Sequence, residues 1–201
     1  MKKLCFAIFF FLTLLPSNVP ADTHLKSFVS IIPQSYFVER IAGEYVSINV
    51  LVAPGQSPHS FEPTPKQVAD IVTADIYFIT GLPFEERLLV KIRGIAPDLK
   101  IIDTAQSIKR VEFKTTHRHA DDHDPHVWLD PKLAKAQAEN IAAALTYISP
   151  EHSKTFMQNL NGLKSDLDEL DSAISAMLKP FRGRKISVSY THLTLPTKRI
   201  V

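Results

Sequence analysis

Two histidines in turns bounded by proline are the side chains of this sequence best suited to chemistry. His59 lies in PGQSPHSFEP at 54–63, and His126 lies in DPHVWLDP at 124–131. Each segment comes after an apolar run typical of a β-strand, and loops held by a rigid sheet often carry binding groups. Two imidazoles fixed in this way can each donate one nitrogen to the same metal ion. The pattern predicts that the two histidines approach one another as candidate metal ligands.

A histidine-rich stretch, HRHADDH at 117–123, lies between them. Its imidazoles belong to His117, His119 and His123. Mixed imidazoles and carboxylates suit weak metal capture, and the same composition is equally typical of a solvated loop. Asp124 and Asp130 flank His126, and either could hold its second ring nitrogen and so fix the tautomer.

The first 21 residues have the order of a signal peptide. Lys2 and Lys3 precede an apolar run at 4–15, and Val19-Pro20-Ala21 places small residues at the positions that a signal peptidase reads. The run has about a dozen residues, whereas a membrane span needs roughly 20. We expect cleavage after Ala21 and a soluble periplasmic protein without a lipid anchor.

The single cysteine, Cys5, lies in the segment expected to be removed. The exported protein would then have no disulfide and no thiolate site. A metal would be held by histidine and carboxylate, a set that suits zinc or manganese. The net charge of +2 gives no sign of nucleic-acid binding, and 45% hydrophobic residues allow a stable core.

Apolar runs and helical patterns alternate along residues 27–104. This order predicts an α/β fold, a parallel sheet with helices on both faces. The expected strands are 27–32, 46–53, 75–80 and 100–104, and the expected helices are 33–42, one beginning at Pro65 with Thr64 as N-cap, and 84–95. Ligands of such sheets bind at the carboxyl ends of the strands, where His59 is expected.

Two further helices are expected, an alanine-rich one at 131–148 and a long one from Pro150 to about Leu178, capped by Ser149. The long helix has a narrow apolar seam with spacings of four and three. A coiled-coil dimer is one interpretation. Because three heptads are short for a coiled coil, we favour a monomer in which this helix packs against the body as a spine. At 1.5 Å per residue it would span about 43 Å and could connect two lobes.

Catalytic motifs are not recognisable in the sequence. It contains no HExxH helix, no G-x-S-x-G turn and no phosphate-binding glycine loop. Glu62 is a candidate general base beside a metal, but its turn gives no reason to expect that role. The sequence therefore favours a binding protein over an enzyme.

The string IIPQSYFVERIAG at 31–43 and the segments 54–65 and 124–131 resemble the zinc and manganese solute-binding proteins of ABC importers, the TroA-like or ZnuA-like family. The resemblance covers about Ser27 to Lys185. It implies a two-lobed receptor with a rigid linking helix and with His59 and His126 as metal ligands. It also implies that the histidine-rich loop is an accessory metal-acquiring loop.

Near its end the sequence departs from the family pattern. The family commonly places a third ligand, histidine in its zinc branch, where this chain has Tyr190, and residues 189–201 do not resemble the family. We therefore expect four parts. They are a signal peptide at 1–21, an N-terminal α/β metal-binding lobe at 22–148, a linker helix at 149–180, and, at 181–201, the start of a truncated C-terminal lobe with a non-family tail.

The resemblance implies a periplasmic receptor that captures Zn²⁺ and hands it to an ABC transporter permease in the inner membrane. Neutral imidazole is the form that binds, so capture should weaken on acidification. A manganese or iron receptor of the same family is the nearest alternative, and the histidine-rich loop favours zinc. Alternatives of another class are a metal-linked adhesin and a secreted zinc hydrolase, which would need an open coordination position and a general base.

Overall fold

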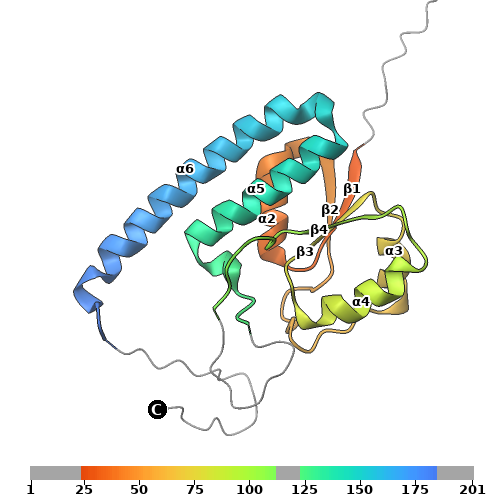
Figure 1. The fold of residues 1–201 in the computed structure, drawn as a ribbon, viewed down its shortest axis with the longest axis horizontal. Coiled ribbons are helices and arrows are strands. Elements are labelled where there is room, and N and C mark those ends of the chain that lie inside the picture. The colour runs from red at the N-terminus through yellow and green to blue at the C-terminus, as the bar shows by residue number, and fades with distance from the viewer. Residues whose placement is uncertain (1–23, 112–122, 185–201) are drawn as a thin grey trace, which may run out of the picture.

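Four parallel strands form the centre of the molecule. The computed structural model describes residues 24–111 and 123–184 (Figure 1). The strands are β1 (Leu25–Val29), β2 (Val46–Val50), β3 (Ile76–Ile79) and β4 (Lys100–Asp103), in the order β2-β1-β3-β4. Val29 pairs with Val50 of β2 on one side and with Phe78 of β3 on the other. All neighbouring strands run parallel, which confirms the predicted sheet.

Helices cover both faces of this sheet, also as predicted. The first face carries α2 (Ile32–Ala42), α5 (Pro131–Ile148) and α6 (Ser153–Leu178), and the second carries α3 (Pro65–Ile71) and α4 (Pro83–Arg93) (Figure 1). Alternate side chains of a strand point to opposite faces, so each face has its own apolar core. Val29 and Phe78 enter the first core, and Phe28 and Tyr77 enter the second. Burial on both faces explains the continuous apolar runs of these strands.

Strand ends are where the predicted boundaries differ from the structure. β1 ends at Val29 rather than at residue 32, and β2 ends at Val50 rather than at residue 53. Leu51 and Val52 nevertheless stay buried, and their N–H groups donate to Val29 O at 3.0 Å and to Ser30 O at 3.1 Å. The apolar run therefore continues past the last ladder pair, which is why the sequence overestimates strand length.

Helix boundaries follow the capping chemistry. Thr64 accepts the Gln67 backbone N–H at 3.3 Å and Pro65 is the first residue of α3, both as predicted. The expected helix at 131–148 has those bounds. The long helix opens with a 3₁₀ turn at Pro150–His152, and the Ser149 side chain makes no capping bond, so the predicted cap is wrong. Other 3₁₀ turns occur at Gly43–Tyr45, Val127–Leu129 and Lys179–Phe181.

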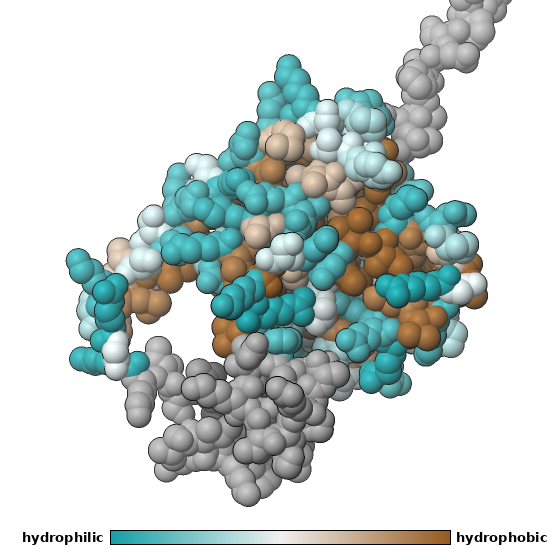
Figure 2. Space-filling view, viewed as in Figure 1, coloured by the Kyte–Doolittle hydropathy of each residue, from teal (hydrophilic) through white to brown (hydrophobic). Residues whose placement is uncertain are grey.

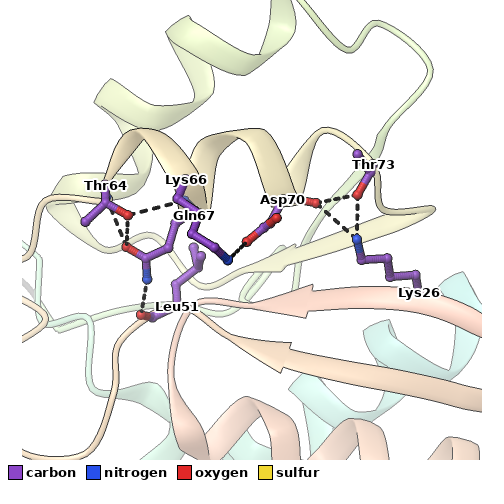
Figure 3. A network of polar contacts seen from close by, with 7 residues as sticks. All are labelled: Lys26, Leu51, Thr64, Lys66, Gln67, Asp70 and Thr73. Atoms are coloured by element: carbon purple, nitrogen blue, oxygen red, sulfur yellow. Dashed lines mark hydrogen bonds and ion pairs between the residues drawn. The ribbon is translucent and has the colours of Figure 1, made fainter.

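A polar network fastens α3 to the sheet (Figure 3). Gln67 Nε2 donates to the Leu51 carbonyl at 2.9 Å. At the other end of the helix, Lys26 Nζ donates to the Asp70 carbonyl at 3.4 Å and to the Thr73 hydroxyl. The bond from Gln67 to Leu51 joins the two ends of the loop that carries His59. It therefore closes the base of that loop.

The long helix α6 lies along α5 and α2, and its second half extends beyond them (Figure 1). The part of α6 up to residue 167 buries Phe156, Leu160, Leu163 and Leu167. Ion pairs flank this contact, as between Asp166 and Arg40 at 2.6 Å. The seam continues into the free end, where Leu170 is 48% and Met177 is 70% exposed, and Figure 2 shows apolar surface there. The seam thus packs against the body through its first half, as expected for a spine helix.

None of the described helices is both long enough and apolar enough to cross a membrane.

Candidate metal centre

His59 and His126 lie side by side, although 67 residues separate them in the sequence. Their ring centroids are 5.3 Å apart and the ring planes are inclined by 54°. The two loops follow β2 and β4, which are the outer strands of the sheet. Adjacent strands are about 4.8 Å apart, so both loops must reach inward over the carboxyl ends of β1 and β3 for the rings to meet. The predicted approach of the two histidines is confirmed.

Asp124 fixes the orientation of His126. The Nδ1–H of His126 donates to Asp124 Oδ1 at 2.6 Å, and the backbone N–H of His126 donates to the same oxygen at 3.0 Å. An ionised carboxylate only accepts hydrogen bonds. The ring proton is therefore on Nδ1, and the Nε2 lone pair is left for a ligand.

The sequence left open which aspartate holds this ring. Asp124 does so, whereas Asp130 caps α5 by accepting the Lys132 backbone N–H at 2.8 Å. Partial burial raises the pKa of Asp124, but the hydrogen bonds from His126 and the charges of His126 and His59 outweigh burial and lower this pKa below its ordinary value. Asp124 is therefore ionised at neutral pH and available to hold the imidazole.

Trp128 supports the His126 ring from another side. The centroids of the two rings are 5.2 Å apart. Trp128 is half-buried and packs against both apolar cores of the molecule. This packing limits the positions open to His126.

The His59 loop is held by its neighbours in the sequence. Phe61 is buried against Phe84 of α4, with ring centroids 4.9 Å apart in an edge-to-face arrangement. Gly55 turns the chain after Pro54 with a φ of 84°, in the left-handed region that favours glycine. His59 itself is exposed. A rigid base thus presents an imidazole that a dissolved ion can reach.

The other predicted ligands are not seen with this pair. His117 and His119 lie outside the described residues, and His123 is exposed. Within residues 24–111 and 123–184, no group of three or more His, Cys, Asp or Glu side chains is arranged to hold a metal. Glu62 lies 4.0 Å from Arg87 of α4. The described part of the site therefore offers two imidazoles, which can fill two of the four positions usual for zinc.

His126 borders a shallow groove of about 280 Å³, which Arg110 and Asp124 also help to line. A larger cavity of about 650 Å³ lies at the opposite end of the strands, beside Leu25 and Lys100. The residues that line this cavity in the described part of the chain include no histidine. The chemistry is thus at the carboxyl ends of the strands, where parallel sheets bind ligands.

A buried carboxyl group near the site, that of Glu85, was not predicted from the sequence. Glu85 is 1% exposed and accepts the backbone N–H groups of Thr80, Gly81 and Leu82 at 2.6 to 3.2 Å. Burial raises its pKa to about 7 against the opposing effect of these bonds. The sequence did contain a signal for this role of Glu85. The helix begins at Pro83, one residue before the predicted start, and proline at the first position with glutamate at the third is typical of a helix N-terminus.

Comparison with known proteins decides the family. The model of the family described as zinc-uptake complex component A, periplasmic (ZnuA), matches residues 28–194. The chain belongs to the ZnuA family. The matched range contains both histidine segments. It also reaches into residues 189–201, which were expected to lie outside the family.

Relatives and solved structures agree with this assignment to the ZnuA family. A Chlamydia muridarum protein described as metal-binding is 30% identical, over 94% of this chain and 67% of that protein. A crystal structure of a ZnuA deletion mutant with zinc bound has a TM-score of 0.72 and 36% identity, over 78% of this chain and 59% of that chain. The manganese-binding lipoprotein MntA of Halalkalibacterium halodurans is 27% identical, over 87% of this chain and 59% of that protein. This chain thus spans about three fifths to two thirds of their length.

Proteins of the ZnuA family and their relatives are named for different metals. Names among the matches specify zinc, manganese and iron. They are metal-binding substrate-binding proteins of ABC importers, and so transport proteins rather than enzymes. The fold described above, a parallel sheet with helices on both faces, is the fold of the matched part of ZnuA.

Proposed function

We propose that this chain captures Zn²⁺ between His59 and His126 in the periplasm and delivers it to the permease of an ABC importer in the inner membrane. The observation that carries the proposal is the 5.3 Å between the ring centroids. Two imidazoles on one tetrahedral zinc ion, with Zn–N bonds of about 2.0–2.1 Å, place their centroids roughly 5 Å apart. The observed spacing therefore supports a shared ion.

Zinc is favoured over manganese by the type of ligand. Imidazole is borderline in softness and suits zinc, whereas manganese prefers carboxylate and water oxygen. Asp124 is bonded to the His126 ring rather than added to a cluster of oxygens. A manganese receptor remains the second candidate, because the relative MntA is named for manganese.

The chemistry proposed is ligand exchange, without a bond made or broken in a substrate. The two histidines fill part of the coordination shell, and water or groups beyond the described residues complete it. A hydrolase would need a general base beside the metal. Glu62, the candidate named from the sequence, lies beside Arg87 instead.

The division of the chain is part of this proposal. Residues 22–148 form the metal-binding lobe, and 149–180 form a helix that links this lobe to another part of the receptor. The exposed apolar side chains on the free half of α6 support the second assignment. They offer a surface of the kind that packs against a further domain.

Calorimetric titration of the purified chain with zinc tests the proposal. We expect His59→Ala and His126→Ala each to weaken binding more than about tenfold, or roughly 1.4 kcal/mol. His24→Ala is the matched control, because His24 is exposed and precedes β1 at the opposite end of the sheet. Zinc binding that is indifferent to both site variants would place the site elsewhere. A manganese affinity above that for zinc would favour the second candidate.

A further inference from the structure

The guanidinium group of Arg110 meets the turn that ends β3 with its Nη1–Nη2 edge. Its Nη2–H donates to the Thr80 carbonyl at 2.9 Å. Gly81 makes room for it, because a Cβ at position 81 would overlap the guanidinium group. Gly81 also has a φ of 80°, a conformation that residues with a side chain rarely adopt. The absence of a side chain at Gly81 therefore leaves the space that the Arg110 guanidinium group occupies, and the positive φ favours glycine there.

Backbone and side-chain bonds connect Arg110 to the metal centre. Its neighbour Val111 accepts the Asp124 backbone N–H at 2.8 Å. The Asp124 carboxylate in turn holds the ring and the backbone of His126. Arg110, Val111, Asp124 and His126 all line the same groove. Two successive hydrogen bonds, one between Val111 and Asp124 and one between Asp124 and His126, thus connect the residue next to Arg110 to a candidate metal ligand.

The turn beneath Arg110 is itself held from inside the molecule. The Glu85 carboxylate accepts the N–H groups of Gly81 at 2.6 Å and Leu82 at 2.7 Å. Gln137 of α5 donates to the Thr80 hydroxyl at 2.9 Å. Because Glu85, Thr80 and Gln137 are all buried, the surface that receives Arg110 is a fixed one.

We propose that Arg110, seated on Gly81, is a positioning residue that holds the Asp124–His126 segment in the geometry needed to bind the metal. This inference rests on the proposed function. A ligand must be held within about 0.5 Å of its productive position by neighbours that are themselves locked. Asp124 and His126 are on a loop, and ordering a loop costs conformational entropy at the moment of binding. Arg110 removes that cost by fastening the base of the segment to the end of β3.

The test compares Arg110→Ala with Lys109→Ala, an exposed neighbour that serves as the matched control. Zinc affinity is measured by calorimetry, and exchange of the Asp124 amide hydrogen is measured without zinc. We expect Arg110→Ala to weaken zinc binding by about tenfold, the lower end for residues that support ligands. We also expect it to accelerate Asp124 exchange while the Phe28 amide in β1 keeps its protection. Lys109→Ala should change neither quantity.

Two further variants separate positioning from general stability. Arg110→Ala in a His126→Ala background should cause no additional loss of zinc affinity, because its effect acts through His126. Arg110→Lys retains a donor for Thr80 but lacks the guanidinium edge beside Gly81, so its loss of zinc affinity should be intermediate. This variant provides the test if Arg110→Ala does not fold.

Arg110→Ala binding within twofold of the unmodified chain, while His126→Ala binds weakly, would overturn the inference and leave the proposed function intact. If Arg110→Ala reduced zinc affinity equally in the His126→Ala background, this result would also overturn the inference. If His126→Ala binds zinc normally, the proposed function fails. The Asp124 exchange rate then decides by itself whether Arg110 fixes the segment.

Discussion

The carboxylate of Asp124 holds His126 at two points, through the ring Nδ1–H at 2.6 Å and the backbone N–H at 3.0 Å. Both bonds end on the same oxygen. The ring is thereby fixed in one tautomer and one orientation, with Nε2 free. This relationship between neighbours in the sequence prepares a loop histidine to act as a ligand before any metal arrives.

Asp124→Asn should weaken zinc binding about 10- to 100-fold, the range for residues that orient a metal-bound histidine. The amide still accepts a hydrogen bond but lacks the negative charge of the carboxylate that holds the ring. Asp98→Asn, at an exposed position near the opposite end of the strands, is the control. Equal zinc dissociation constants for the two variants would show that the Asp124 charge has no part in binding.

Glu85 should make the stability of the chain depend on pH. Burial raises its pKa from the ordinary 4.5 to about 7. Between these values the folded chain keeps the proton while the unfolded chain releases it. The free energy of unfolding should therefore fall as pH rises through this window, by an amount on the order of 3 kcal/mol, and level off above it.

Glu85→Gln should remove the contribution of Glu85 to the pH dependence of the free energy of unfolding. Urea unfolding at pH 5, 6, 7 and 8 measures this contribution as the difference in free energy of unfolding between the unmodified chain and the variant. The effects of the histidines are the same in both chains and cancel in the difference. A difference that does not change with pH would mean that Glu85 titrates alike in the folded and unfolded chains.

The two halves of the α6 seam should respond differently to truncation. Leu163 is fully buried, so Leu163→Ala should lower the free energy of unfolding by about 2–5 kcal/mol. Met177 is 70% exposed, and Met177→Ala should change it by less than about 0.5 kcal/mol. Chemical denaturation of the 201-residue chain measures both. Comparable losses would show that the free end packs as tightly as the first half.

The sheet could be predicted from the sequence because its strands are buried on both faces. Segments such as 76–79 are continuously apolar, and the helix that follows β2 has a clear start, with Thr64 as its N-cap and Pro65 as its first residue. The order of the strands could not be predicted in this way. Nothing local indicates that β2 and β4 are the outer strands or that their loops meet above β1 and β3.

The candidate site was predictable to the level of its two imidazoles. The proline-bounded turns mark His59 and His126, but which aspartate supports His126 depends on the shape of the loop. Arg110 was not predictable, because its role arises from contact with a turn 30 residues earlier in the sequence. Similarly, the α6 seam has one pattern throughout, and only the position of α2 and α5 decides where its burial ends.

Export is a further expected property of the chain. The signal-peptide pattern lies in residues 1–21, outside the described residues, and predicts a mature N-terminus at Asp22. N-terminal sequencing of periplasmic material from an expressing bacterium measures this. An uncleaved or lipid-modified chain in the membrane fraction would contradict the prediction, and several relatives are named as lipoproteins.

X-ray absorption spectroscopy of the zinc-loaded chain tests most directly whether His59 and His126 share one ion. We expect nitrogen scatterers at about 2.0–2.1 Å with the outer-shell features of imidazole. The imidazole signal should decrease in His59→Ala and again in His126→Ala. His24→Ala should leave the spectrum unchanged. A spectrum that is the same in all three variants would show that His59 and His126 do not share the ion, because zinc would then be bound without either histidine.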